Sequence, residues 1–303
     1  MQDSKIEDGQ SEETTPSILG LIWRGLLMGL AEVVPGVSGG TIALITGIYS
    51  HLVNCLASLS FASVRLLTTP RAFYEHHRLG FLLPLIAGMV VGIWLFAQLI
   101  VVLLERFQPV VWAFFFGVIA TSVVVVGKNR SPKMLLTYGL LGLVASLLLT
   151  HAGQLTAQPS PLLFFLAGMI AVSAWILPAI SGSYLLLILG LYEPMLEAVR
   201  QLDLVSLASL GAGCVVGLLL FIRALKWVLE HHYERLLSLL TGFLLGSVLN
   251  LWPWQWQAES RWSEFVSPDS YATLSNEPAW FGIAIVFAVT GGVFLWFIAS
   301  RRV

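Results

Sequence analysis

Two short polar segments interrupt the apolar stretches of this chain, and both hold residue types that can bind an anion. The first reads PGVSGGT (35–41) and the second reads PAISGS (178–183). Proline and glycine end helices and expose backbone N–H groups, and a serine or threonine can cap the helix that follows. Free amides at a helix N-terminus attract anions. We therefore predict an anion site with contacts from Pro35, Gly36, Ser38, Gly39, Gly40, Thr41, Ser181, Gly182 and Ser183.

Three charged residues lie inside apolar stretches, where a charge is costly and usually functional. We expect Arg24 and Arg223 to help bind the anion, and Glu32 to carry a proton or help bind sodium. Eight residues of helix separate Arg24 from Glu32 by about 12 Å, too far for a direct ion pair. Simpler roles stay open: Arg24 as a structural partner, Arg223 reaching toward the membrane surface, and Glu32 capping a helix end or pairing with Arg223.

Other chemistry-bearing patterns are weak. The run Gly36–Gly40 fits the G-x-S-x-G pattern of serine hydrolases, but an apolar helix precedes it where that elbow needs a strand, and no His or Asp partner is evident. The pairs His76-His77 and His231-His232 are adjacent residues whose side chains diverge on a helix, which disfavours a metal site. We expect no catalytic residue, no metal site and no cofactor other than a coupling proton or sodium ion.

The composition is that of a membrane protein. Of 303 residues, 57% are hydrophobic and 11% charged, with a mean hydropathy of +0.85 and a net charge of -1. Too little polar surface remains to coat a soluble globule of this size, and nothing points to nucleic acid. Cys55 and Cys214 lie in apolar surroundings and are expected to be buried thiols. Oligomeric state stays open.

Ten apolar segments follow a polar cytoplasmic tail at residues 1–17. They form two groups of five, which we assign as repeat 1 (18–150) and repeat 2 (161–303). In repeat 1 we expect a hairpin at 18–61 and transmembrane helices near 79–104, 109–126 and 133–150. In repeat 2 we expect a hairpin at 161–199 and transmembrane helices near 206–229, 236–254 and 280–300.

The basic residues predict the orientation. With the N-terminus in the cytoplasm, eleven Lys and Arg residues fall on the cytoplasmic side, and only Arg106, Arg200 and Arg261 fall outside. This split obeys the positive-inside rule, so we expect both termini in the cytoplasm. The longest outer loop, 255–279, is expected to be a solvated loop beside an aromatic anchor at the membrane interface.

The two groups of five are copies of one another. PGVSGGTIALITGIY (35–49) matches PAISGSYLLLILGLY (178–192) at seven of fifteen positions, a shift of 143 residues. AGMVVGIWLF (87–96) matches AGCVVGLLLF (212–221) at seven of ten, a shift of 125 residues. Gly88, Gly92, Gly213 and Gly217 in the second match are expected to be helix-packing faces.

The duplication predicts how the chain is threaded. An odd number of crossings per copy places the copies upside down relative to each other, as in many secondary transporters. The stretch 18–31 is short for a full span, so a re-entrant hairpin is the better interpretation, although full spans at 41–61 and 183–199 stay open. We predict an all-α polytopic membrane protein of two inverted repeats, each a re-entrant hairpin followed by three transmembrane helices, with the two hairpin apices meeting.

The stretches GLAEVVPGVSGGTIALITGIY (29–49) and LPAISGSYLLLILGLY (177–192) resemble the paired signatures of the bacterial polyprenyl-phosphate transporter family. The resemblance covers nearly the whole chain from Ile18 onward. The family more often has an aspartate where Glu32 stands and a glycine where Ala179 stands. The first departure keeps the carboxylate, and the second stiffens the second apex.

The resemblance implies an inner-membrane lipid transporter rather than an enzyme. It would be a flippase that returns undecaprenyl phosphate, the lipid carrier of cell-wall sugars, from the outer to the cytoplasmic leaflet. The partners expected are polyprenyl phosphate and the bilayer. The main rival is a transporter or antiporter for a small soluble anion, for which the substrate site would be closed to the bilayer. A lipid phosphatase or transferase and a non-transporting subunit are the remaining alternatives.

Overall fold

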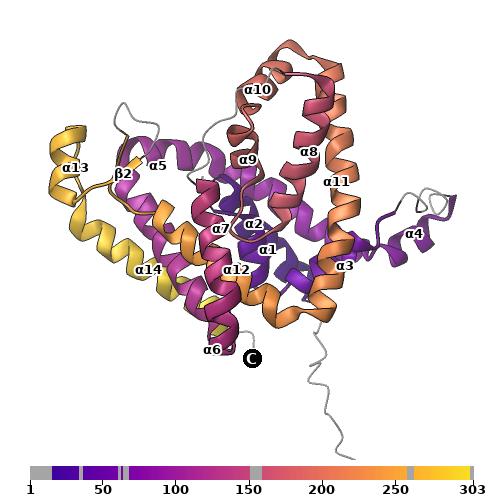
Figure 1. Cartoon of the computed structure of the whole chain (residues 1–303), viewed down its shortest axis with the longest axis horizontal. Coiled ribbons are helices and arrows are strands. Elements are labelled where there is room, and N and C mark those ends of the chain that lie inside the picture. The colour runs from indigo at the N-terminus through magenta and orange to yellow at the C-terminus, as the bar shows by residue number, and fades with distance from the viewer. Residues whose placement is uncertain are drawn as a thin grey trace, which may run out of the picture.

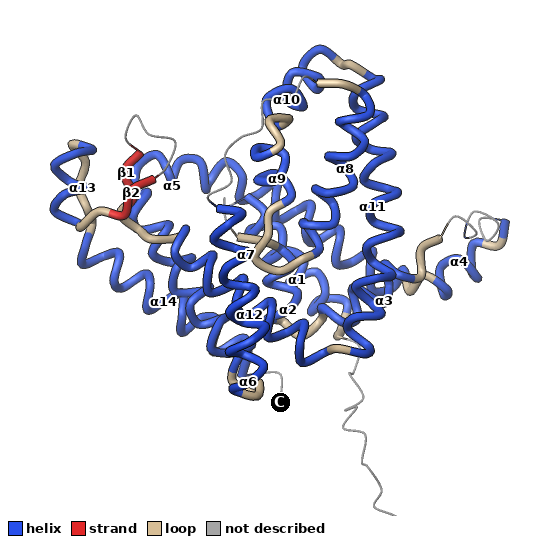
Figure 2. Tube along the Cα trace, in the orientation of Figure 1, coloured by secondary structure: helices blue, strands red, loops and turns tan. Residues whose placement is uncertain are grey.

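The computed structural model describes residues 16–33, 37–60, 63, 68–150, 159–257 and 263–300, and it is mostly helical (Figures 1 and 2). The helices are α1 (Ile18–Val33), α2 (Gly39–Ile45), α3 (Tyr49–Ala57), α4 (Pro70–His76), α5 (Leu79–Gly127), α6 (Pro132–Met134), a π-helix (Leu135–Gly139), α7 (Leu140–Thr150), α8 (Pro161–Ile176), α9 (Gly182–Ile188), α10 (Tyr192–Gln201), α11 (Leu204–His231), α12 (Tyr233–Asn250), α13 (Pro268–Ser275) and α14 (Phe281–Ser300). Strands β1 (Gln255–Gln257) and β2 (Ser263–Phe265) form an antiparallel pair.

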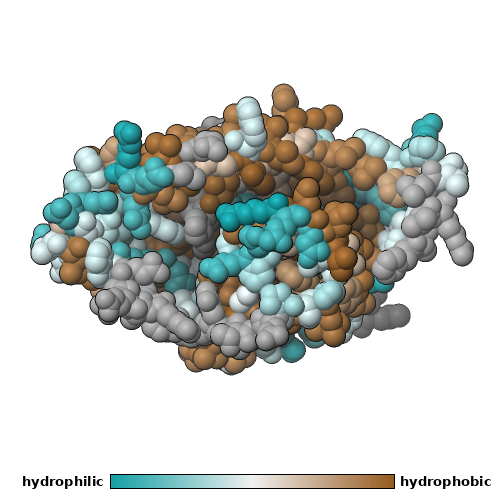
Figure 3. Space-filling view, turned by 90° about the horizontal axis from the view of Figure 1, so that it is seen from above, coloured by the Kyte–Doolittle hydropathy of each residue, from teal (hydrophilic) through white to brown (hydrophobic). Residues whose placement is uncertain are grey.

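Several helices are long and apolar enough to cross a membrane. Five qualify in the described part of the chain: Leu79–Ala97, Val102–Gly127, Pro132–Thr150, Leu204–His231 and Phe281–Ser300. Two bent helix pairs would raise the number to seven. Seen from the end that carries α10, one group of hydrophilic side chains lies near the middle of the face, with hydrophobic side chains above it and to its right (Figure 3). The chain is therefore an all-α, multi-pass membrane protein, as predicted.

The arms that follow the two polar segments are broken helices. Helix α2 meets α3 at 118°, and α9 meets α10 at 104°. Gly47 lies at the first bend with φ 76° and Gly190 at the second with φ 68°, a left-handed backbone that glycine adopts without a steric penalty. The sequence stretches 41–61 and 183–199 are thus not continuous straight helices.

Helix bounds recur at the two shifts seen in the sequence. Helices α1 and α8 match residue for residue at 143, as do α2 and α9, and the starts of α5 and α11 are 125 residues apart. Helix α5 is kinked at Phe107 (φ −136°, ψ 37°). The equivalent residue, 125 positions later, is His232 (φ −137°, ψ 36°), which separates α11 from α12. The two copies of the sequence therefore fold into the same series of helices.

Glycines hold the helices of each copy close together. A Cβ at Gly88 of α5 would overlap the carbonyl of Ile22 in α1, and one at Gly213 of α11 would overlap that of Phe165 in α8. Gly92 and Gly217 meet the backbones of Leu26 and Met169 in the same manner. These contacts confirm that the four glycines are helix-packing faces, where a missing side chain lets backbones approach.

The last helix of each copy packs against the other copy. In α7, Gly142 lies against the carbonyl of Leu239 in α12, and in α14, Gly291 lies against the carbonyl of Phe114 in α5. Leu239 and Phe114 are themselves 125 residues apart, so the two contacts are equivalent. Figure 1 shows α7 beside α12 and α14 beside α5. The two copies are therefore interlocked through exchanged helices.

The described residues of the outer segment 255–279 are mostly exposed and include β1, β2 and α13. The Nε1 of Trp254 donates to the Ala279 carbonyl at 2.8 Å. Trp254 and Tyr271 are buried together with Ala284 of α14. The segment therefore carries short strands and a helix beside buried aromatic residues, a detail that the expected loop did not include.

Basic and aromatic residues meet where several helices end. Lys128 lies over the Trp296 ring at 5.8 Å, and Arg130 lies over the Tyr233 ring at 5.2 Å. The α5–α6 connection and the α11–α12 turn lie at the lower end of Figure 1, whereas α10, which carries Arg200, lies at the upper end. These two connections, which the sequence assigns to the cytoplasmic side, thus lie at the end of the molecule opposite α10.

Candidate functional site

The two polar segments contact each other, as predicted. The backbone N–H of Ala179 donates to the Thr41 hydroxyl at 2.9 Å, and the Ser38 hydroxyl donates to the Leu177 carbonyl at 3.4 Å. Gly40 lies against the backbone of Ile176, where an added Cβ would be 2.9 Å from the carbonyl oxygen. Residues 138 and 139 positions apart are thereby joined, with Ser38 and Thr41 almost fully buried. Pro35 and Gly36 lie outside the described residues.

The amides that begin α2 already have acceptors. Glu32 Oε1 accepts from the N–H of Gly39 at 2.7 Å, and the Ser38 hydroxyl accepts from the N–H of Gly40 at 3.2 Å. Ser38 is therefore the N-cap of α2, and Glu32 supplies the anion that such a helix end attracts. The expectation of free backbone amides at the first apex was wrong, because the chain provides its own carboxylate there.

Arg24 lies at the opposite end of α2. Its Nε donates to the carbonyl of Thr46, the C-cap residue of α2, at 3.4 Å, and its Nη1 donates to the Gly20 carbonyl at 3.1 Å. Helix α2 has seven residues and is about 10 Å long. Arg24 and Glu32 are about 12 Å apart along the neighbouring antiparallel helix α1, so each can reach one end of α2. The two charges thus flank α2 with the signs that its dipole favours. Arg24 therefore has a structural role here, as the partner of a backbone carbonyl. The sequence left this role open as an alternative to anion binding.

The second hairpin lacks both charges. Ala167 stands where the repeat would place Arg24, and Trp175 stands where it would place Glu32. The Trp175 side chain lies near the Glu32 carboxylate, so these two equivalent positions meet between the hairpins. The Ser181 and Ser183 hydroxyls bond to each other at 2.8 Å, and Ser183 is exposed. No side chain of the described residues caps α9, and Ser183 is the exposed residue of its first turn.

Arg223 lies apart from these groups. Its side chain is exposed on α11, one turn from Leu220 and one turn from Trp227, which are also exposed. Within the described ranges it makes no hydrogen bond or ion pair, and it does not contact Glu32 or Arg24. The structure therefore groups Glu32, Ser38, Thr41 and the second apex, and it leaves Arg24 and Arg223 on other parts of the helices.

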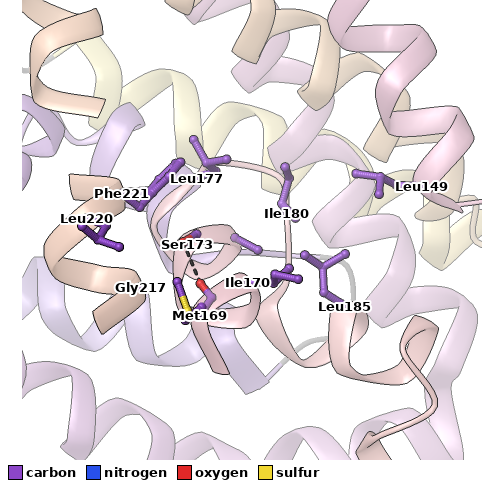
Figure 4. A pocket seen from close by; sticks show the side chains of 11 residues that line it. Leu149, Met169, Ile170, Ser173, Leu177, Ile180, Leu185, Gly217, Leu220 and Phe221 are labelled. Carbon is purple, nitrogen blue, oxygen red and sulfur yellow. Dashed lines mark hydrogen bonds between the residues drawn. The ribbon is translucent and has the colours of Figure 1, made fainter. Parts of the chain in front are cut away.

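A cavity of about 510 Å³ lies beside the second apex (Figure 4). Phe221 and Leu220 of α11 line one side, and Ile180 and Leu185 lie across from them, with Ser173 of α8 between. Its full lining is Leu149, Met169, Ile170, Ser173, Ala174, Leu177, Ile180, Leu185, Gly217, Leu220 and Phe221. Ile170 of α8 is 46% exposed and Leu220 of α11 is 59% exposed, so the cavity is open at the side along this packed pair of apolar helices. Sequence reasoning missed it.

One position could have revealed this cavity. Ser173 corresponds to Leu30 at a shift of 143, and Ile180 and Phe221 correspond to Val37 and Phe96. In the first copy Leu30, Val37 and Phe96 all pack into one hydrophobic cluster. The second copy has a small serine where the first has a leucine. A comparison of side-chain sizes between the two copies could therefore have indicated the cavity.

Ala179 offers a test of the second apex. Its φ of 69° lies in the left-handed region, which costs an L-residue with a Cβ roughly 1–2 kcal/mol. Ala179→Gly should raise the free energy of unfolding by a net of about 0.5 kcal/mol after glycine's entropy cost, seen as a slightly higher thermal unfolding temperature. Ala208→Gly, on the exposed helical surface of α11, is the control and should lower stability by about 1 kcal/mol. Equal losses in both variants would contradict the strained backbone.

Comparison with known proteins shows the family of this chain. A model of the VCA0040-like, undecaprenyl phosphate translocase-like family matches residues 28–267. This chain belongs to that family. A polyprenyl-phosphate transporter of Vibrio cholerae serotype O1 is 35% identical over 286 residues, covering 90% of this chain and 93% of the relative. A polyprenyl-phosphate transporter of Staphylococcus aureus is 31% identical over 252 residues, covering 77% of this chain and 85% of the relative.

The match to the undecaprenyl phosphate translocase-like family covers most of the candidate site. The matched region begins at Met28 in α1 and includes the first apex, the second hairpin, α5, α11 and α12, whereas Arg24 lies just before it. No solved structure matches the chain.

Proposed function

We propose that this protein is a flippase that returns undecaprenyl phosphate from the outer to the cytoplasmic leaflet, where the carrier is reused for cell-wall synthesis. The observation that carries the proposal is the cavity beside the Ser181–Ser183 apex, which is open at the side along the packed pair α8 and α11. A lipid substrate needs such an opening, because its chain stays in the bilayer while its phosphate moves. A small soluble anion has no use for an apolar side entrance.

The phosphate end of the lipid would bind at the second apex. Ser181, Gly182 and Ser183 offer hydroxyls and the uncapped first turn of α9, and Ser183 is exposed. The first apex contributes indirectly: Ser38, Gly39, Gly40 and Thr41 hold the second hairpin in place through Leu177 and Ala179. In this proposal Arg223 supplies positive charge along the exposed face of α11, and Arg24 fixes α2.

Energetics favour coupling to a cation. Inward movement of one negative charge against an inside-negative potential costs about 2.3 kcal/mol per 100 mV. A proton or sodium ion moving with the lipid cancels that cost. Glu32 is the acidic side chain at the junction of the two hairpins, so we assign coupling to it. No enzymatic step and no further cofactor belong to the proposal.

The membrane arrangement follows from the same elements. We place both termini in the cytoplasm of an inner-membrane protein, with α10 and α13 on the outer side, since the basic helix ends lie opposite them. The bends at Gly47 and Gly190 suit re-entrant hairpins entering from opposite sides. The two copies are then inverted repeats, each a hairpin followed by three transmembrane helices.

A leaflet-specific assay of undecaprenyl phosphate in proteoliposomes tests the function. Vesicles with the protein should equilibrate labelled lipid between leaflets far faster than empty vesicles. Ser183→Asp places a negative charge on the exposed apex and should slow transfer about tenfold by repelling phosphate. Ser270→Asp, on exposed α13, is the matched control and should transfer at the wild-type rate. Equal rates with and without the wild-type protein would sink the lipid assignment.

A further inference from the structure

We propose that the cavity beside α9 binds the isoprene units next to the phosphate, and that it selects polyprenyl phosphates over phospholipids with a phosphate headgroup. This inference rests on the proposed function and adds a specificity site to it. A phosphate site alone would not separate polyprenyl phosphate from phosphatidic acid, since both present a phosphate monoester. The chain next to the phosphate must supply the difference.

The cavity is unlike a packing defect. It is open at the side rather than enclosed, and its volume of about 510 Å³ lies within the usual range for ligand pockets. In the first copy Leu30 stands where Ser173 stands, and it packs in one hydrophobic cluster with Val37 and Phe96. The described cavity lies in the second copy, which is also the copy with the uncapped apex.

The lining determines which chain fits. Ile180 lines the cavity and is followed directly by Ser181, so the surroundings change from apolar to polar within one residue. A polyprenyl chain becomes hydrocarbon at the first carbon after the phosphate oxygen. A phospholipid instead places glycerol and two ester groups there, which need hydrogen-bond partners when buried. The hydroxyl of Ser173, the polar side chain in the lining, already donates to the Met169 carbonyl at 2.7 Å.

Selectivity in this site comes from packing. The bilayer is as apolar as the cavity, so transfer of a chain between them yields little from the hydrophobic effect. A methyl-branched chain that fills the space makes dispersion contacts that the mobile lipid does not offer. Blocking the space should therefore reduce the preference between lipids and leave phosphate binding at the apex intact.

The test measures competition for the full-length protein in lipid nanodiscs. Labelled undecaprenyl phosphate is displaced by unlabelled undecaprenyl phosphate or by phosphatidic acid, and the ratio of the two midpoints is the selectivity. Wild-type protein should prefer undecaprenyl phosphate at least about tenfold, a difference of about 1.4 kcal/mol. Ser173→Leu, which installs the residue of the first copy, should lower that ratio at least about fivefold.

Two controls and a second blocking variant complete the design. Ser173→Ala leaves the cavity open. Ser209→Leu makes the same exchange on a part of α11 away from the cavity. Ser209 is a matched position because its hydroxyl donates to the Val205 carbonyl, four residues earlier, as the Ser173 hydroxyl does to that of Met169. Both should keep the wild-type ratio. Leu220→Trp changes an exposed side chain, so it blocks the opening of the cavity without entering the core. It should lower the ratio as Ser173→Leu does. It therefore keeps the test valid if Ser173→Leu does not fold.

The outcomes separate the two proposals. If the wild-type protein transfers lipid between leaflets but folded Ser173→Leu or Leu220→Trp keeps full selectivity, the cavity does not bind the chain and the inference is overturned. A wild-type ratio near one overturns it as well. If the wild-type protein transfers no lipid, the proposed function itself fails.

Discussion

Glu32→Gln should abolish the dependence of transport on an ion gradient, or abolish transport altogether. Glutamine keeps the Oε1 atom that accepts from the Gly39 N–H, so the N-terminal end of α2 retains its partner. It loses the charge and the site for a proton, which the coupling role requires. We expect a folded protein whose transfer rate no longer responds to a pH or sodium gradient, measured in the proteoliposome assay with each gradient imposed separately.

The matched variant for this experiment is Ser38→Ala. It removes the other side-chain cap of α2, which bonds to the Gly40 N–H, and leaves the carboxylate in place. Loss of an N-cap costs about 1 kcal/mol of stability, so Ser38→Ala should be less stable yet still respond to the gradient. If Glu32→Gln transports with the wild-type ion dependence, Glu32 is a helix cap only and coupling lies elsewhere.

Gly213→Ala should be strongly destabilising, whereas Gly211→Ala, two residues earlier on α11, should not. A Cβ at Gly213 would overlap the Phe165 carbonyl of α8, and one at Gly211 would meet nothing within 4 Å. Overpacking of a tight helix contact costs about 2 kcal/mol, and alanine in an open helical position gains up to about 1 kcal/mol over glycine. The two variants should therefore differ by about 3 kcal/mol in unfolding free energy.

Thermal unfolding of both variants in the same detergent gives the comparison. The equivalent substitution in the first copy, Gly88→Ala, overlaps the Ile22 carbonyl and should behave like Gly213→Ala. Similar unfolding temperatures for Gly213→Ala and Gly211→Ala would show that α8 and α11 do not pack as described.

The sequence allowed the helical membrane class, the duplication and the meeting of the two polar segments to be predicted, because each leaves a local pattern. Apolar runs show in composition, and the glycines of the helix contacts recur at fixed shifts. The partners of charged residues do not show this way. Arg24 and Glu32 bond to the two ends of α2, a pairing that depends on the fold-back of α2 along α1.

The cavity and the exchanged helices also lay beyond sequence reasoning. The cavity lies where Ser173 is small and where α7, α8, α9, α11 and the loop before α9 converge, and that convergence is a tertiary property. The packing of α7 on α12 depends on which apolar face meets which, and apolar helices with small residues offer several solutions. The strands and the helix after Trp254 were not predicted either, because they depend on contacts of a few aromatic rings with α14.

The exchange of the last helices has a consequence for biosynthesis. When the ribosome has completed α7, the surface of α12 that Gly142 packs against has not yet been made. The first copy therefore waits in the membrane with a helix-packing face uncovered, and its assembly is finished by residues of the second. A chain cut between α7 and α8 would yield two halves that each present an unmatched helix, so they should become stable only when produced together.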